Sequence, residues 1–139
     1  MVVTRHSLDF SRRHSYASQL AITIPVTLIS GIDTQVDFSA KLDTGSTYCI
    51  FQGKYADWLG LDLTSGAATK IATATGSFYC YGHELTLSVF DLEWHAVMYF
   101  AESEAFSLNV VGRVGFLDRL RVGLIDYEQL IYLGMYDRL

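Results

Sequence analysis

One stretch of this chain reads Lys41-Leu42-Asp43-Thr44-Gly45-Ser46-Thr47. It continues residues 36–42, in which apolar and polar side chains alternate with the period of a β-strand. The small residues after Asp43 are typical of a tight turn. The sequence therefore predicts a strand that ends by presenting the Asp43 carboxylate on a turn, with backbone amides close by.

The composition of the chain is that of a single folded domain. It has 139 residues, of which 50% are hydrophobic and 18% are charged, and this excludes a disordered chain. Residues 20–139 are predicted to form the domain. Residues 1–19 are rich in Arg and Ser and lack the apolar centre of a secretory signal, so they are predicted to be a flexible N-terminal arm. The same composition also fits an organelle transit peptide.

Charge and hydropathy indicate which classes of partner and which cellular compartment the sequence favours. The net charge is −5, and no stripe of basic residues predicts nucleic-acid binding. No run of about 18 apolar residues predicts a membrane span, so the sequence favours a cytoplasmic protein without a membrane partner. Cys49 and Cys80 match no zinc spacing, and the four His residues are scattered. We therefore expect no metal and no cofactor, and we expect the two cysteines to be small hydrophobic residues that are buried or half-buried.

Short strand patterns separated by turns recur along the chain and predict an all-β fold, either a barrel or a sandwich. The predicted strands cover residues 20–29, 34–42, 48–51, 78–90, 94–100, 108–111, 121–126 and 129–133. The spacing of apolar residues predicts short helices within 53–61 and 116–120. Residues 64–75 are small and polar, and a turn is predicted at 76–77. Pro25, the only proline, predicts an edge or a bulge in the first strand.

A second element stands about seventy residues after the Asp43 turn and reads Asn109-Val110-Val111-Gly112-Arg113. Together the two elements resemble the retropepsin-like, single-lobe aspartic proteases. The pattern of that family is an apolar residue before Asp-Thr/Ser-Gly-Ala/Ser, then a flap hairpin, then two apolar residues before Gly-Arg and a short helix. Residues 116–127 resemble the end of bacterial and cellular members. The resemblance spans roughly residues 22–134, and the two elements in this order are more specific than either alone.

This resemblance implies a closed β-barrel-like fold with one or two short helices, and a homodimer. Peptide hydrolysis needs a base to activate water and an acid to protonate the reacting amide. Two carboxylates about 3 Å apart share one proton and supply both roles. Because the chain has one Asp-Thr-Gly turn, a two-fold dimer would supply the second Asp43. Asp91, Asp118 and Asp126 are alternatives within one chain, but none lies in such a turn.

In the family, the residues beside the catalytic aspartate support its turn. Thr44 would hydrogen-bond across the dimer, and Gly45 would leave its backbone open to the substrate. Ser46 resembles the pepsin-type choice, and its hydroxyl could hydrogen-bond the carboxylate and lower the pKa of the pair. In retroviral members the Arg of the second element pairs with an aspartate whose place here is taken by Thr47, so Arg113 needs another partner.

The resemblance also implies a flap and a wall for the substrate site. The predicted flap and substrate-binding residues are Thr75, Gly76, Ser77 and Phe78. The predicted active-site wall consists of Val110, Val111, Gly112 and Arg113. Small residues between 65 and 77 would permit the flap to move. The alternatives are an ordinary polar hairpin turn and a buried strand that ends in a glycine turn.

The sequence thus favours an aspartic endopeptidase that cleaves peptides as a homodimer. One alternative is a peptide-binding module of the same fold that is inactive or weakly active. Another is a structural β-barrel in which both elements occur by accident. Whether two Asp43 carboxylates meet across a two-fold axis separates these hypotheses.

Overall fold

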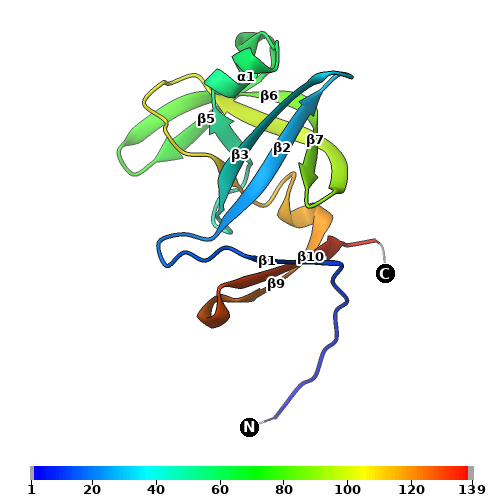
Figure 1. Ribbon diagram of the computed structural model, residues 1–139. Coiled ribbons are helices and arrows are strands. Elements are labelled where there is room, and N and C mark those ends of the chain that lie inside the picture. The colour runs from blue at the N-terminus through cyan, green and yellow to red at the C-terminus, as the bar shows by residue number, and fades with distance from the viewer. Residues whose placement is uncertain (1, 138–139) are drawn as a thin grey trace.

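The computed structural model describes residues 2–137 and consists mainly of β-strands (Figure 1). The strands are β1 (Arg12–Ser15), β2 (Thr23–Ser30), β3 (Thr34–Leu42), β4 (Ile50–Gln52), β5 (Ala67–Thr73), β6 (Gly76–Val89), β7 (Leu92–Ala101), β8 (Val110–Val111), β9 (Leu120–Ile125) and β10 (Leu130–Met135). The helical segments are α1 (Lys54–Trp58) and the single 3-10 turns η1 (Leu63–Ser65), η2 (Leu117–Arg119) and η3 (Asp126–Glu128). None of these described helices is long and apolar enough to cross a membrane. The predicted all-β fold with short helices is confirmed.

Seven strands form one sheet that curls back on itself. Its order is β2-β3-β8-β4-β7-β6-β5, and β2 also pairs with β6, which gives the sheet its barrel-like form. The β5–β6 hairpin extends away from the rest of the sheet (Figure 1). The β2–β6 pairing covers only Thr27–Ile29. Pro25 therefore lies where β2 has β3 as its one neighbour, and its missing N–H costs no ladder hydrogen bond there.

The interior of the barrel-like sheet holds the main hydrophobic core, in which Phe51, Phe100 and Phe116 are fully buried. Alternate side chains of β6 and β7 point into it, because each strand has one face toward the interior and one toward solvent. A smaller apolar cluster lies between β4, β7 and the β5–β6 hairpin. This hairpin cluster consists of Ile50, Cys80 and Ala101 with the half-buried Tyr48, Ile71, Phe78, Tyr99 and Phe106.

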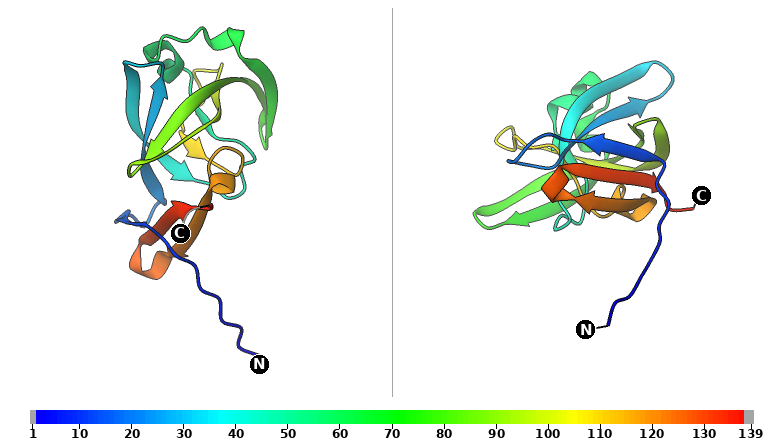
Figure 2. Two further views of the ribbon diagram at one scale, coloured as in Figure 1. Left: turned by 90° about the vertical axis from the view of Figure 1, so that its right-hand side faces the viewer. Right: turned by 60° about the horizontal axis from the view of Figure 1, so that its bottom comes forward.

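The two ends of the chain form a second sheet of three strands, in the order β1-β10-β9 (Figure 2). β1 pairs antiparallel with β10 along all four of its residues. Tyr16, directly after β1, is buried, and its hydroxyl donates a hydrogen bond to the Asp126 carboxylate. Burial and the neighbouring carboxylate raise the pKa of the Tyr16 phenol to about 12. Residues 12–16 are thus part of the folded structure.

β1 lies within residues 1–19, the segment predicted to be a flexible arm, and was not expected there. Arg12–Ser15 contains no apolar residue, so no hydrophobic pattern marks it as a strand in the sequence. Backbone hydrogen bonds to β10 hold it instead, and these are independent of side-chain type. In addition, Nε of Arg12 donates to the Phe90 carbonyl at 2.6 Å.

β5 is a strand that the sequence analysis did not identify. Most of its side chains are exposed, so apolar and polar residues do not alternate in the way that marks a half-buried strand. It is the last strand of the large sheet and pairs with β6 from Ala67, opposite Gly82, to Thr73, opposite Gly76. The hairpin turn therefore consists of Ala74 and Thr75, and the turn predicted at 76–77 is wrong by two residues.

Both cysteines are free and buried, as predicted. Burial raises the pKa of the Cys49 and Cys80 thiols to about 12. Near neutral pH both thiols stay protonated and therefore unreactive. They pack as small hydrophobic residues.

Candidate active site

Asp43 stands at the point where β3 ends. β3 and β8 run parallel, with Leu42 opposite Val111. The Asp43 amide donates a hydrogen bond to the Val111 carbonyl at 3.0 Å, so the first residue after the strand is still held by β8. The Asp43 side chain is exposed. The structure thus presents this carboxylate to solvent from a fixed strand end.

Hydrogen bonds within the turn hold the Asp43 carboxylate against a backbone amide. The Gly45 amide donates to Oδ1 of Asp43 at 2.9 Å, and the Ser46 amide donates to the Asp43 carbonyl at 3.1 Å. A Cβ at position 45 would lie only 3.2 Å from the same Oδ1. Glycine at position 45 therefore leaves room beside the Asp43 carboxylate, and the Gly45 amide can approach this carboxylate closely.

The Ser46 hydroxyl does not make the hydrogen bond expected of it. It donates to the Tyr48 carbonyl at 2.7 Å. A hydroxyl has one proton to donate. Within residues 2–137 no Ser46–Asp43 side-chain hydrogen bond is formed, and the expected effect of Ser46 on the pKa of the pair has no structural basis here.

Gly112 lets the second element pack directly on the turn. A Cβ at this position would lie 2.5 Å from both the Ser46 and the Tyr48 carbonyl oxygens, which is closer than a carbon atom can approach. The neighbouring Arg113 amide donates to the Ser46 carbonyl at 2.9 Å, and the Gly112 amide lies 3.4 Å from the Cys49 sulfur. The conformation of the turn therefore depends on contacts that only glycine permits at this position.

Val110 and Val111 support the turn from behind and do not form the predicted wall. β8 lies between β3 and β4 in the sheet, so their side chains are 7% and 0% exposed. Neither lines a groove beside Asp43. Of the four predicted wall residues, Arg113 alone has an exposed side chain.

A groove of about 410 Å³ runs past the Asp43 carboxylate. One side is built from the turn and the segment that leaves it, and the other from the middle of β5. The residues that line this Asp43 groove are Asp43, Gly45, Ser46, Thr47, Tyr48, Ile50, Lys70, Ile71 and Ala72. Asp43 supplies the one carboxylate among them.

The hairpin reaches this groove with residues other than those predicted. Residues 75–78 do not line it, whereas Lys70, Ile71 and Ala72 do. Thr75, Gly76 and Ser77 are exposed at the end of the hairpin, and the Phe78 ring packs on Phe106 with 5.1 Å between ring centroids. The register of β5 against β6 decides this placement, and the sequence shows no pattern from which that register could be read.

The solved structures that are similar to this chain include the following two. A retropepsin-like aspartic protease from Rickettsia conorii has a TM-score of 0.66 at 17% sequence identity, over 88% of this chain and 98% of that chain. The EIAV protease in complex with the inhibitor HBY-793 has a TM-score of 0.55 at 16% identity, over 72% of this chain and 88% of that chain. The chain has the retropepsin fold. No protein-family model and no curated protein matches its sequence.

In this retropepsin fold a second groove, of about 500 Å³, lies beside the same turn. The residues that line this Arg113 groove are Thr44, Thr47, Arg113, Val114, Leu117 and Asp118. Thr47 lines both grooves. Arg113 thus faces a different groove from the one at Asp43.

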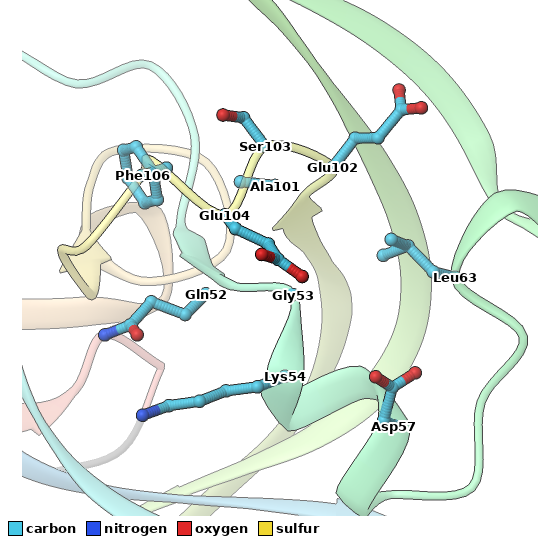
Figure 3. A pocket seen from close by; sticks show the side chains of 10 residues that line it. All are labelled: Gln52, Gly53, Lys54, Asp57, Leu63, Ala101, Glu102, Ser103, Glu104 and Phe106. Carbon is cyan, nitrogen blue, oxygen red and sulfur yellow. The ribbon is translucent and has the colours of Figure 1, made fainter.

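A third pocket of the retropepsin fold, of about 330 Å³, lies between α1 and the loop after β7 (Figure 3). Its lining residues are Gln52, Gly53, Lys54, Asp57, Leu63, Ala101, Glu102, Ser103, Glu104 and Phe106. The Lys54 ammonium lies over the Tyr55 ring, 5.2 Å from its centroid, and Figure 3 shows it extending away from Asp57. None of the lining residues is shared with the Asp43 groove, so this pocket is separate from the Asp43 site.

Proposed function

We propose that this chain is an aspartic endopeptidase that works as a homodimer. The observation that carries the proposal is the Asp43 turn. Its carboxylate is exposed, is bound by the Gly45 amide at 2.9 Å and stands at a strand end held by β8. This arrangement occurs in a fold that the chain shares with two proteases.

The proposed reaction needs two carboxylates that share one proton. The ionised Asp43 of one subunit takes a proton from water as the water oxygen attacks the peptide carbonyl carbon, while the protonated Asp43 of the partner subunit gives its proton to the carbonyl oxygen. In the resulting diol, one carboxylate takes a hydroxyl proton and the other donates its proton to the amide nitrogen. The C–N bond then breaks. The products are a carboxylic acid and an amine, and the pair again holds one proton.

A second chain is required because Asp43 is alone in its groove. No other carboxylate among residues 2–137 lines it. Asp126 accepts a hydrogen bond from Tyr16, and Asp118 accepts one from the Gly115 amide at 3.0 Å, so both have other structural roles. A two-fold axis beside the turn would place the partner subunit's Asp43 about 3 Å away. The exposed Thr44 would then face the partner as well.

The β5–β6 hairpin is proposed to act as the flap over a bound peptide. β5 is the edge strand of the large sheet and lies along the Asp43 groove. An edge strand has unpaired backbone groups, to which an extended peptide can add by β-type hydrogen bonds. The exposed end of the hairpin, predicted as the flap tip at residues 75–78, would close over the peptide by a motion of the hairpin.

The proposed substrate has apolar side chains next to the cleaved bond. Three residues of the Asp43 groove, Tyr48, Ile50 and Ile71, also belong to the hairpin cluster. Apolar side chains of a peptide would bury surface against them, and this favours binding by about 25 cal/mol per Å². The hairpin cluster would thus set the cleavage preference.

Cleavage of an unfolded protein tests the proposal directly. The purified chain should release fragments that mass spectrometry detects, and pepstatin should inhibit the reaction. Because only dimers carry the carboxylate pair, the activity per chain should rise with protein concentration. A chain that sediments as a dimer but cleaves nothing between about pH 3 and pH 8 is the peptide-binding module instead.

The Ser46→Ala variant should leave the pH dependence of cleavage unchanged. The Ser46 hydroxyl binds the Tyr48 carbonyl at 2.7 Å and not the Asp43 carboxylate. Loss of this hydrogen bond should lower the free energy of unfolding by about 0.5–1.5 kcal/mol. The measurements are kcat/KM against pH and a denaturant titration. A shift of the acidic limb would show that Ser46 does act on the carboxylate pair.

A further inference from the structure

The Arg113 groove lies where a partner subunit must approach. The proposed function, on which this inference rests, requires two Asp43 carboxylates about 3 Å apart. Thr44 follows Asp43 directly and lines the Arg113 groove, and Thr47 lines both grooves. A partner near enough to share a proton with Asp43 is therefore also near this groove.

The groove carries a positive charge that the protomer does not neutralise. The Arg113 side chain is exposed, and the hydrogen bonds of this residue are made by its backbone: the amide donates to the Ser46 carbonyl at 2.9 Å and the carbonyl accepts from the Asp118 amide at 3.0 Å. Within residues 2–137 its guanidinium makes no hydrogen bond and no salt bridge. A guanidinium presents N–H donors in a planar fork that matches a carboxylate.

The same groove carries a negative charge with one open side. Oδ1 of Asp118 accepts a hydrogen bond from the Gly115 amide at 3.0 Å and lies 3.6 Å from Nε of Arg119. This ion pair with Arg119 engages Oδ1 alone, and Nη1 of Arg119 donates to the His95 carbonyl at 3.0 Å. The Asp118 side chain is 50% exposed, and its second oxygen accepts no hydrogen bond from the described part of the chain. It is free to accept a donor from outside the protomer.

We infer that two copies of this chain pack at their Arg113 grooves, with Arg113 of each protomer paired to the partner subunit's Asp118. In a two-fold interface every contact between two different residues occurs twice, so the dimer contains two such pairs. Val114, which is 46% exposed, and the partly buried Leu117 supply apolar surface between the charges. The groove is thus a self-complementary surface, with both signs of charge and an apolar part.

Exchange of charge between two variants tests this pairing. In the Arg113→Glu homodimer two carboxylates meet at each contact, and in the Asp118→Arg homodimer two guanidinium groups meet. Each variant alone should raise the dimer Kd by at least about tenfold in sedimentation velocity, because like charges repel at an interface. In an equal mixture, every contact of a heterodimer brings together opposite charges. The mixture should therefore dimerise like the wild-type chain and, since each heterodimer keeps two Asp43 residues, should regain cleavage.

Recovery in the mixture is decisive because Arg113 and Asp118 line one groove and could pair within a protomer. Pairing within a protomer predicts recovery in the double variant Arg113→Glu/Asp118→Arg but none in the mixture. That result, or single variants that dimerise as tightly as wild type, overturns the inference and leaves the proposed function intact. A wild-type chain that stays monomeric and cleaves no peptide overturns both.

Two further pairs of variants serve as controls: one removes the charges without reversing them, and the other reverses charges away from the groove. Asp118→Asn keeps an oxygen for the Gly115 amide, so it should fold where Asp118→Arg fails. Arg113→Gln and Asp118→Asn should each raise the dimer Kd. The double variant should raise the Kd no more than either single variant does, because both remove the same pair. If the two effects on the Kd multiply, the pairing is overturned. Lys54→Glu and Glu104→Arg, at the separate pocket of Figure 3, are matched charge reversals and should leave the dimer Kd unchanged.

Discussion

The Asp43→Asn variant should lose about three orders of magnitude in kcat/KM for peptide cleavage while keeping the wild-type fold. An amide at this position can serve neither as the base nor as the acid, and general acid–base catalysis contributes about 10²–10⁴ in rate. The asparagine oxygen can still accept the hydrogen bond that the Gly45 amide donates to Oδ1 at 2.9 Å. Because the side chain is also exposed, the free energy of unfolding should change by less than about 0.5 kcal/mol. A fluorogenic peptide and a denaturant titration measure the two quantities.

The activity of an equal mixture of the Asp43→Asn variant and the wild-type chain shows whether the active site is shared between subunits. If each active site needs Asp43 from both subunits, random exchange in an equal mixture leaves about a quarter of the dimers active. Activity per total chain should then fall to about one quarter, whereas sites built within single chains would leave about one half. A residual activity of one half would contradict the shared site.

Asp37→Asn is the matched control for the loss of a carboxylate. Asp37 lies on β3, the strand that ends directly before Asp43. Its side chain is exposed and accepts a hydrogen bond from the Thr27 hydroxyl at 2.5 Å. It lines no part of the Asp43 groove. This variant should therefore keep the wild-type kcat/KM. A parallel loss of activity in both variants would point to net charge and not to the chemistry of Asp43.

Gly112→Ala should lower both the stability of the chain and its activity. The added Cβ would lie 2.5 Å from the Ser46 and Tyr48 carbonyl oxygens, so β8 and the turn must move apart. We expect a loss of about 1–3 kcal/mol in the free energy of unfolding, as for an overpacked core. A shift of the turn by about 1 Å also misplaces the carboxylate, and this should cost about 10²-fold in kcat/KM.

The control for this prediction is Gly134→Ala in β10, another buried glycine. Its Cβ would have its nearest neighbours at 3.4 Å, in ordinary van der Waals contact, and β10 belongs to the other sheet from β3 and β8. It should therefore keep wild-type kcat/KM. If Gly112→Ala is as stable and as active as wild type, the turn is not held in place by this close packing.

The parts of the site that depend on local sequence were predictable. The alternation before Asp43 marks β3, and the small residues after it mark the turn. The apolar pair before Gly112 marks β8, which the structure places parallel to β3 beside Asp43. Each of these features follows from side-chain periodicity or from the backbone freedom of glycine, which act over a few residues.

The remaining parts depend on pairing between distant segments. β5 carries no amphipathic pattern, so neither the strand nor the position of Lys70 in the Asp43 groove could be read from sequence. The Ser46 hydroxyl had two possible acceptors in the turn, and only the folded backbone shows that it binds the Tyr48 carbonyl. β1 is held by main-chain hydrogen bonds, which leave no trace in residue type.

The position of β1 affects the tendency of this chain to aggregate. β10 has β1 on one edge and β9 on the other, so neither edge of β10 is open to a strand of another molecule. β1 and β10 belong to the same chain, so Arg12–Ser15 are present at a high local concentration beside the edge of β10. An open strand edge invites pairing with other chains and aggregation. Truncation before residue 16 would replace β1, an edge strand without apolar residues, by the apolar β10, and an apolar edge strand is more prone to pair with other chains.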